Sequence, residues 1–285
     1  GIHISTLMTT LPNSKDIDAV LMPHWGWTDL LQHVGMVRYY QTQYKTISLV
    51  CLPHQREFLE ALYPDFELIF VPCPDHGEID LVTRRLFDDD YLFLLDGHQC
   101  SDGFIRSCLR QNLIPRTEIQ QINCESLSKT AWHDILNIKH MDATDAEFDE
   151  RIGFYTLSGL THSVAFEYFK IVRDYNAEQE KYSQLVSHSE YSVVHYVEGM
   201  NLSHVKYPLV YLNDNSSKII DMIKIIENAK EVHLYDSLYG ILSYFLYFSG
   251  QLKGPKFYLH KYARMKIPKF FDYKRMEESG DWNVL

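Results

Sequence analysis

Residues 226–249 read IENAKEVHLYDSLYGILSYFLYFS, and this stretch decides the expected fold. A β-prone run at 232–235 is followed directly by Asp236 and Ser237, and an apolar helix is expected over 238–248. The pattern therefore predicts a strand, a sharp turn and a helix. Asp and Ser at such a turn can cap the helix by accepting hydrogen bonds from its first N–H groups. The same N–H groups and the helix dipole also favour binding of phosphate there.

In the first half of the chain, apolar runs typical of strands alternate with segments typical of helices. We expect strands at 2–7, 17–22, 46–52, 66–72 and 91–95, and helices at 29–44, 53–62, 80–87 and 103–112. Continuous apolar strands separated by helices are typical of a parallel sheet covered by helices.

The second half of the chain repeats this alternation. We expect strands at 191–196, 209–212, 232–235 and 256–260, and helices at about 217–228 and at 238–248. The mostly polar, helix-prone residues 145–186 separate the two halves. The sequence thus predicts an α/β protein with two halves of similar construction.

Composition and charge limit the kinds of partner. The 285 residues carry a formal net charge of −11, so the chain has no general attraction to nucleic acid or to anionic membranes. Its five Cys residues form no C-x-x-C pair, which fits reduced thiols. The apolar run at 241–248 is too short to span a bilayer, and residues 1–10 lack the basic region of a signal peptide. We expect a soluble, cytoplasmic protein without a transmembrane segment.

Several common types of site are absent from the sequence. There is no H-E-x-x-H and no paired Cys/His spacing for zinc, and neither a G-x-G-x-x-G after a strand, a P-loop nor a G-x-S-x-G elbow is present. Residues 88–90 read DDD, but they precede an expected strand and would lie at the opposite edge of the sheet from a ligand. We therefore expect no metal site.

Three segments carry a family resemblance. Residues 24–40 (HWGWTDLLQHVGMVRYY) resemble the G-x-G-D-x-(apolar) loop and helix of heptosyltransferase-like glycosyltransferases of the GT-B architecture and of related bacterial and viral proteins. Residues 229–237 (AKEVHLYDS) are similar to their A-x-E-I-H-x-x-D-S-S motif, and 257–264 (FYLHKYAR) to the segment that follows. This chain departs from the pattern at Thr28, where the family has Gly, and at Leu238, where it has a second Ser.

The resemblance implies a particular fold and division of the chain. Two Rossmann-like domains would face each other across a cleft, as in GT-B enzymes. Residues 1–160 would form the acceptor-side domain, 161–188 a helical bridge, 189–267 the nucleotide-sugar domain and 268–285 a C-terminal arm.

The resemblance also implies an activity, namely inverting transfer of a sugar from a nucleotide sugar to a hydroxyl of a glycan or other acceptor, without metal or other cofactor. Asp29 would be the general base that takes the proton of the acceptor hydroxyl. It can alternatively serve only as the cap of a helix beginning at Leu30. By resemblance and position, His24, Trp25 and Asp96 would line the acceptor site.

The donor-binding residues are expected at the strand ends of the second half. They are His195, Asp236, Ser237, Leu238, Tyr239, His260, Lys261 and Arg264. The first N–H groups of the helix and the cationic side chains would stabilise the leaving diphosphate without metal. Alternatively, His195 is only structural, and Lys261 and Arg264 belong to a solvated basic surface.

Two other functions stay open on the sequence. A nucleotide-sugar epimerase of the same fold would use the same donor site. The departures at Thr28 and Leu238 also fit a catalytically degenerate protein that binds sugar nucleotides or serves as a scaffold.

Overall fold

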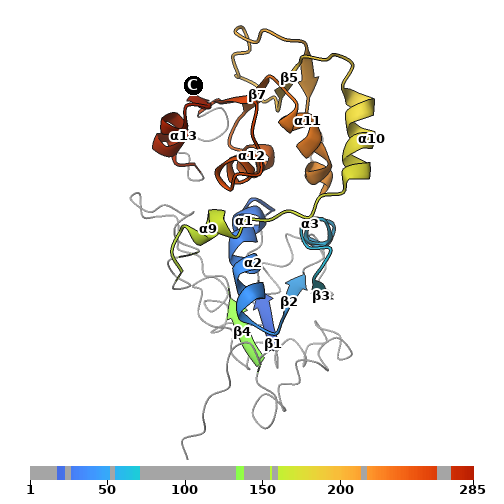
Figure 1. Ribbon diagram of the computed structural model, residues 1–285, viewed down its shortest axis with the longest axis vertical. Helices are drawn as coiled ribbons and strands as arrows, with labels where there is room; N and C mark the ends of the chain where they lie inside the picture. The colour runs from blue at the N-terminus through green and yellow to red at the C-terminus, as the bar shows by residue number, and fades with distance from the viewer. Residues whose placement is uncertain are drawn as a thin grey trace, which may run out of the picture.

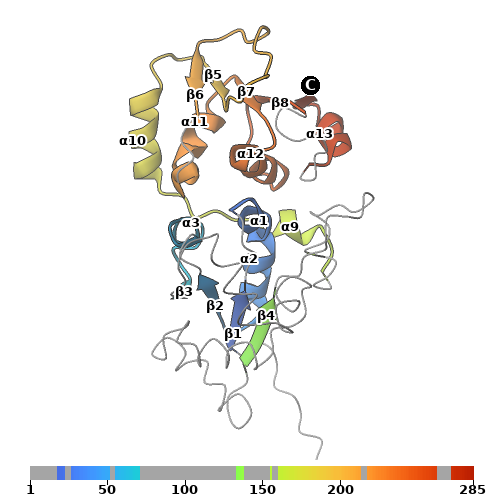
Figure 2. The same cartoon turned by 180° about the vertical axis from the view of Figure 1, so that it is seen from behind.

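A computed structural model describes residues 18–22, 27–51, 55–70, 133–137, 155, 160–212, 217–261 and 271–285. These residues form two parallel β-sheets, with helices between them (Figures 1 and 2). The expected mixed α/β class with parallel sheets is confirmed. The elements expected at 2–7, 80–87, 91–95 and 103–112 lie outside the described residues.

The first sheet, sheet A, is built around β1. Its strands are β1 (Asp18–Met22), β2 (Thr46–Cys51), β3 (Glu67–Phe70) and β4 (His133–Asn137). Among the described strands the order is β3-β2-β1-β4, and every pair is parallel. The chain moves from β1 to β2 and β3 on one side, and then places β4 on the other side of β1. β1 therefore lies where the direction of winding reverses.

The helices of the first half are α1 (Trp27–Gln32), α2 (Val34–Gln43) and α3 (Arg56–Leu62). The single helix expected over 29–44 is instead two helices. At the junction the buried Tyr155 hydroxyl donates to Gln32 O at 2.6 Å and accepts from Met36 N at 3.3 Å. A side chain inserted into the backbone ladder in this way interrupts a helix.

The second sheet, sheet B, is also entirely parallel. Its strands are β5 (Ser192–Val194), β6 (Leu209–Tyr211), β7 (Glu231–Leu234), β8 (Lys256–Leu259) and β9 (Trp282–Val284). The order β6-β5-β7-β8-β9 places the first strand of the sheet between the second and the third. The direction of winding therefore reverses between β5 and β7, which is where open α/β sheets bind ligands.

Helices η4 (Ser217–Met222), α11 (Ile223–Glu227), α12 (Leu238–Phe248) and α13 (Tyr273–Ser279) accompany sheet B. The helix expected over 238–248 is confirmed as α12. Side chains alternate along a strand, so Val232, Leu234 and Phe257 lie in the core with α12, and Tyr247 of α12 packs on Phe257.

The segment joining the two halves is helical only at its ends. α9 (Val164–Glu167) and α10 (Tyr175–Leu185) flank a non-helical stretch, residues 168–174, where the sequence suggested a helical bridge. Its backbone is bonded on both sides. Arg38 Nε donates to Lys170 O at 3.4 Å, and Gln251 Nε2 donates to Phe169 O at 2.6 Å.

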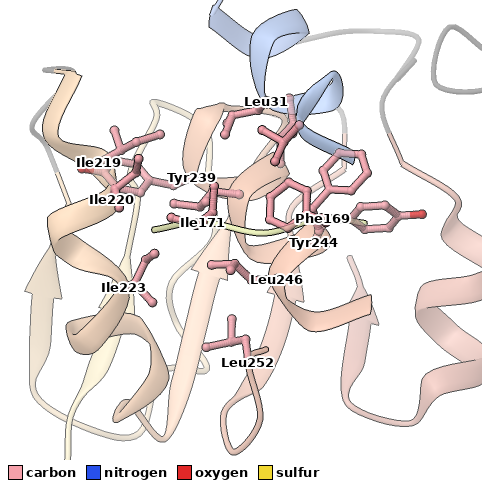
Figure 3. Packing of buried hydrophobic residues seen from close by; sticks show 14 of the residues in the cluster. Leu31, Phe169, Ile171, Ile219, Ile220, Ile223, Tyr239, Tyr244, Leu246 and Leu252 are labelled. Carbon is pink, nitrogen blue, oxygen red and sulfur yellow. The ribbon is translucent and has the colours of Figure 1, made fainter. Parts of the chain in front are cut away.

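One continuous cluster of buried apolar side chains reaches from β1 and β2 to β8 and β9. Helix α1 contacts α12, α3 contacts η4, and α9 contacts both α2 and α12. Figure 3 shows Leu31 of α1 beside Phe169 and Tyr244 in this core. Phe169 also stacks on Phe245 with ring centroids 5.2 Å apart.

Candidate functional site

The turn after β7 is tight because only three residues separate the end of the strand at Leu234 from the start of α12 at Leu238. Ser237 N donates to Tyr235 O at 2.8 Å, and the Ser237 backbone is extended (φ −138°, ψ 174°). Ser237 is the N-cap of α12, and its Oγ accepts from Gly240 N at 3.2 Å. A Cβ at Gly240 would clash with Tyr235 O. Only glycine fits here without displacing the backbone. Gly240 therefore allows the first turn of α12 to pack against the backbone that follows β7.

His195 follows β5 and meets this turn from the neighbouring strand. Its Nδ1 lies 2.8 Å from Ser237 Oγ, and its Nε2 lies 3.5 Å from the Tyr235 hydroxyl. The ring stacks on Tyr235 (4.7 Å) and meets Tyr239 edge-on (4.8 Å). Only 5% of His195 is exposed. The structure thus joins the two strand ends at the reversal point of sheet B through a His–Ser hydrogen bond.

A second set of hydrogen-bonded polar side chains lies on the face of sheet B opposite α12. Glu231 Oε2 accepts from Ser192 Oγ at 3.0 Å and from Lys206 N at 3.4 Å. The same oxygen lies 3.7 Å from His233 Nε2. His233 Nδ1 in turn lies 3.2 Å from His260 Nε2, just after β8. These contacts form one chain of polar groups, here called the Glu231–His260 chain, that leads to the carboxyl end of the sheet.

Burial keeps both histidines of this chain neutral. Removal from water lowers the pKa of His260 to about 4, and a charge on His233 would lower it further. Burial also lowers the pKa of His233, although Glu231 opposes that shift. At neutral pH this favours an uncharged His260, whereas the sequence suggested a cationic side chain beside phosphate.

The neutral His pair makes stability depend on pH. The unfolded chain takes up protons near pH 6.5, whereas the folded pair does so only at lower pH. The stabilisation is therefore complete above pH ~6.5 and is lost as the pH falls towards about 4. We expect the free energy of unfolding to fall by about 1–2 kcal/mol between pH 7 and pH 5, after allowance for solvent screening.

Urea denaturation at both pH values measures this loss. His260→Gln is the control, because Gln keeps a polar atom near His233 but does not titrate. The variant should lose less stability than the wild type over the same interval. An equal loss in both proteins would show that the pair does not cause it.

The remaining predicted residues are placed as follows. Asp29 lies in the first turn of α1 and is half-buried. Because α1 begins at Trp27, the alternative that Asp29 caps a helix beginning at Leu30 is wrong. Asp236 is buried, Leu238 and Tyr239 open α12, and Lys261 follows His260 with its ammonium 5.1 Å from the Tyr273 ring. His24, Trp25, Asp96 and Arg264 lie outside the described residues.

Sequence reasoning missed Glu231, His233, Tyr235 and Ser192 as parts of the polar groups around the turn. A signal was available, since Glu231 and His233 are polar residues two apart at the start of an otherwise apolar strand. Residues two apart lie on one face of a strand, so the pair marks a polar face that needs partners.

No group of three or more His, Cys, Asp or Glu within the described parts of the chain is arranged to hold a metal ion. In those same parts, no helix combines the length and the apolar character needed to cross a membrane.

Comparisons with known proteins give distant similarity to solved structures and nothing beyond that. No family model matches the chain, and no curated protein matches it. Among solved structures, the chain is similar to the glycosyl transferase family 9 protein from Veillonella parvula DSM 2008, with 10% sequence identity and a TM-score of 0.47. The similarity covers 95% of this chain and 87% of that chain.

Proposed function

We propose that this protein is a glycosyltransferase that moves a sugar from a nucleotide sugar to a hydroxyl of a glycan or other acceptor. One observation carries the proposal. Helix α1, which follows β1 of sheet A, contacts α12, which begins at the reversal point of sheet B. Ligands of open α/β sheets bind at the carboxyl ends of the strands. The contact between α1 and α12 therefore supports a single site to which both sheets contribute residues.

The donor would bind at the turn between β7 and α12. The first N–H groups of a helix have no acceptor within the helix, and together with the dipole they attract phosphate. Leu238 and Tyr239 contribute these groups, and Ser237 and His195 frame them with hydroxyl and imidazole. We propose that Lys261, on the neighbouring strand end, adds positive charge beside the diphosphate, with Arg264 after it. Asp236, buried in the same turn, would hold its shape.

The acceptor would bind on the side of α1. We propose Asp29 as the general base, because it lies in the first turn of the helix that contacts α12 and is half-buried. A carboxylate there can take the proton of an attacking hydroxyl while the diphosphate leaves. His24 and Trp25, just before this helix, and Asp96 would contact the acceptor. The proposed transfer is inverting and needs no metal.

A thermal-shift screen against UDP, GDP, ADP, CMP and dTDP tests the donor site. A nucleotide at a hundred times its dissociation constant should stabilise the protein by about 2.7 kcal/mol. Ser237→Ala removes the cap hydroxyl and should weaken the response, whereas Ser183→Ala on the exposed surface of α10 should not. If no nucleotide stabilises the wild type, the proposed function is wrong.

The same protein can be used to separate the alternative functions. A transferase releases nucleoside diphosphate only when an acceptor or water takes the sugar, whereas an epimerase returns an isomerised nucleotide sugar without acceptor. A catalytically degenerate binding protein would respond to a nucleotide in the screen but change no nucleotide sugar, and a pure scaffold would not respond at all.

A further inference from the structure

The Glu231–His260 chain is not used by the proposed transfer, yet it is built from buried groups. Glu231, His233 and His260 are 7%, 3% and 6% exposed. They lie on the face of sheet B opposite the core helices, where His233 stacks on Tyr258 with ring centroids 4.6 Å apart. The chain ends at His260, at the same edge of the sheet as Ser237 and Lys261.

The contacts of the Glu231–His260 chain favour one arrangement of its protons. Glu231 Oε2 already accepts from Ser192 and from Lys206 N, so it is an acceptor where it approaches His233 Nε2 at 3.7 Å. A carboxylate oxygen repels a ring lone pair and attracts a ring N–H. This attraction favours the tautomer of His233 with the proton on Nε2 and the lone pair on Nδ1.

That lone pair in turn sets the state of His260. His260 Nε2 lies 3.2 Å from His233 Nδ1 and, with that tautomer of His233, is the donor. A neutral imidazole has one donor and one acceptor, so Nδ1 of His260 is left as an acceptor. Within the described residues Nδ1 has no hydrogen-bond partner.

We propose that His233 is a positioning residue that holds His260 with an acceptor nitrogen toward the ligand, and that His260 there receives a hydrogen bond from a hydroxyl of the nucleotide sugar. This inference rests on the proposed function. An acceptor nitrogen repels phosphate oxygens, so His260 selects for the polyol part of the donor and leaves the diphosphate to α12 and Lys261. The lowered pKa of His260 agrees with a neutral ring.

Nitrogen NMR of the histidine side chains tests the first half of the inference. The expected result is a proton on Nε2 of both His233 and His260, assigned with His233→Phe and His260→Gln. In Glu231→Gln the preference of His233 should weaken, and His260 should become a mixture of both tautomers. A proton on Nδ1 of His260 in the wild type overturns the inference, whether or not any ligand binds.

Two variants of His260 test the second half. Gln places a polar atom near the former Nε2 and keeps the contact with His233, whereas Asn places one near the former Nδ1. Binding is measured by calorimetry with UDP and UDP-glucose, and with the corresponding GDP, ADP and dTDP pairs. His260→Gln should weaken binding about fivefold to tenfold, and His260→Asn should retain most of the affinity.

Comparing each nucleoside diphosphate with its nucleotide sugar also shows which hydroxyl donates to His260. If it belongs to the ribose, His260→Gln weakens the diphosphate and the nucleotide sugar equally. If it belongs to the transferred sugar, only the nucleotide sugar is weakened. Equal affinity of His260→Gln and the wild type for both ligands overturns the inference, although the proposed function stands. Failure of the wild type to bind any of these ligands overturns the proposed function and the ligand half of the inference, while the NMR result still decides the proton positions.

Discussion

Asp29→Asn is expected to lower the turnover of the nucleotide sugar by about 10²–10⁴-fold, the usual contribution of a general base. Asn has nearly the same shape as Asp, so α1 and its contact with α12 should persist. What is lost is the ability to take a proton from the attacking hydroxyl. Affinity for the nucleoside diphosphate should stay unchanged, because the proposed donor groups lie on sheet B.

Release of nucleoside diphosphate measures the turnover, and calorimetry measures the affinity. Glu57→Gln is a matched control, because Glu57 is also an acidic residue in the first turn of a helix, namely α3. The control should turn over like the wild type. Unchanged turnover in Asp29→Asn would remove Asp29 from the role of base and leave the donor site unaffected.

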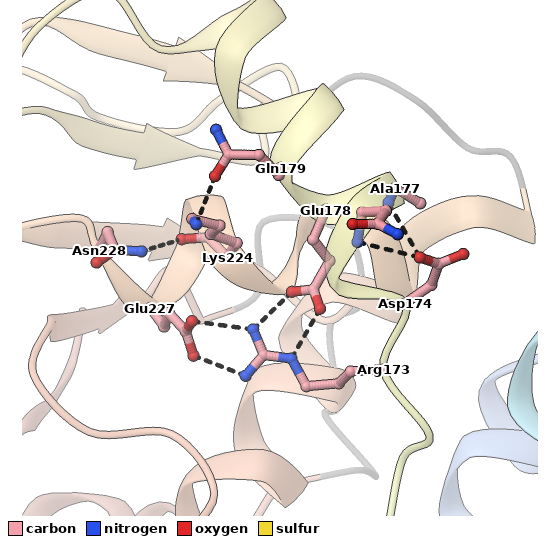
Figure 4. A network of polar contacts seen from close by, with 9 residues as sticks. Arg173, Asp174, Ala177, Glu178, Gln179, Lys224, Glu227 and Asn228 are labelled. Atoms are coloured by element: carbon pink, nitrogen blue, oxygen red, sulfur yellow. Dashed lines mark hydrogen bonds and ion pairs between the residues drawn. The ribbon is translucent and has the colours of Figure 1, made fainter.

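The largest expected effect on stability comes from Arg173→Leu, at about 3–5 kcal/mol. Both oxygens of the fully buried Glu178 are bonded to Arg173, at 2.6 and 2.9 Å. Arg173 also donates twice to Glu227, at 2.9 Å each, and so ties α10 to α11 (Figure 4). Without Arg173, the Glu178 carboxylate would stay buried with its bonds broken, which is costly.

Urea denaturation of three variants checks this prediction. Arg56→Leu breaks an exposed pair with Glu60, in which both side chains are about half exposed, and should cost less than about 1 kcal/mol. The double variant Arg173→Leu/Glu178→Leu should recover much of the lost stability, because the fully buried charge of Glu178 is gone and only the partly exposed Glu227 loses its partner. If Arg173→Leu lowered the free energy of unfolding no more than Arg56→Leu does, the prediction would be wrong, and Glu178 would be bonded to water or to another partner in the variant.

The elements of sheet B were predictable where a single strong pattern specifies them. The run at 232–235, the Asp236–Ser237 turn and the apolar segment after it gave β7, the N-cap and α12. By contrast, β4 reads HDILN and β9 reads WNV. Both are short and carry polar residues, so local pattern does not separate them from loops, and only pairing with a neighbouring strand makes them strands.

The positions of the candidate residues at the sheet edge were predictable, but their contacts were not. Strand ends indicated His195, Ser237 and His260, and the structure places all three at one edge of sheet B. His195 and Ser237 are 42 residues apart, and their pairing depends on β5 and β7 being neighbours, which a single sequence does not reveal. The neutral state of His260 depends on burial and on His233 across the strand, so its charge could not be deduced from its residue type.

The shared apolar core has a consequence for how the protein melts. Leu31 of α1 and Tyr239 and Phe245 of α12 belong to one cluster with the strands of both sheets. Separating the two sheets would expose that cluster to water. Each half would then be less stable than it is in the intact protein. The described elements are thus coupled into one cooperative unit, and any motion that admits a substrate has to be small enough to leave α1 seated on α12.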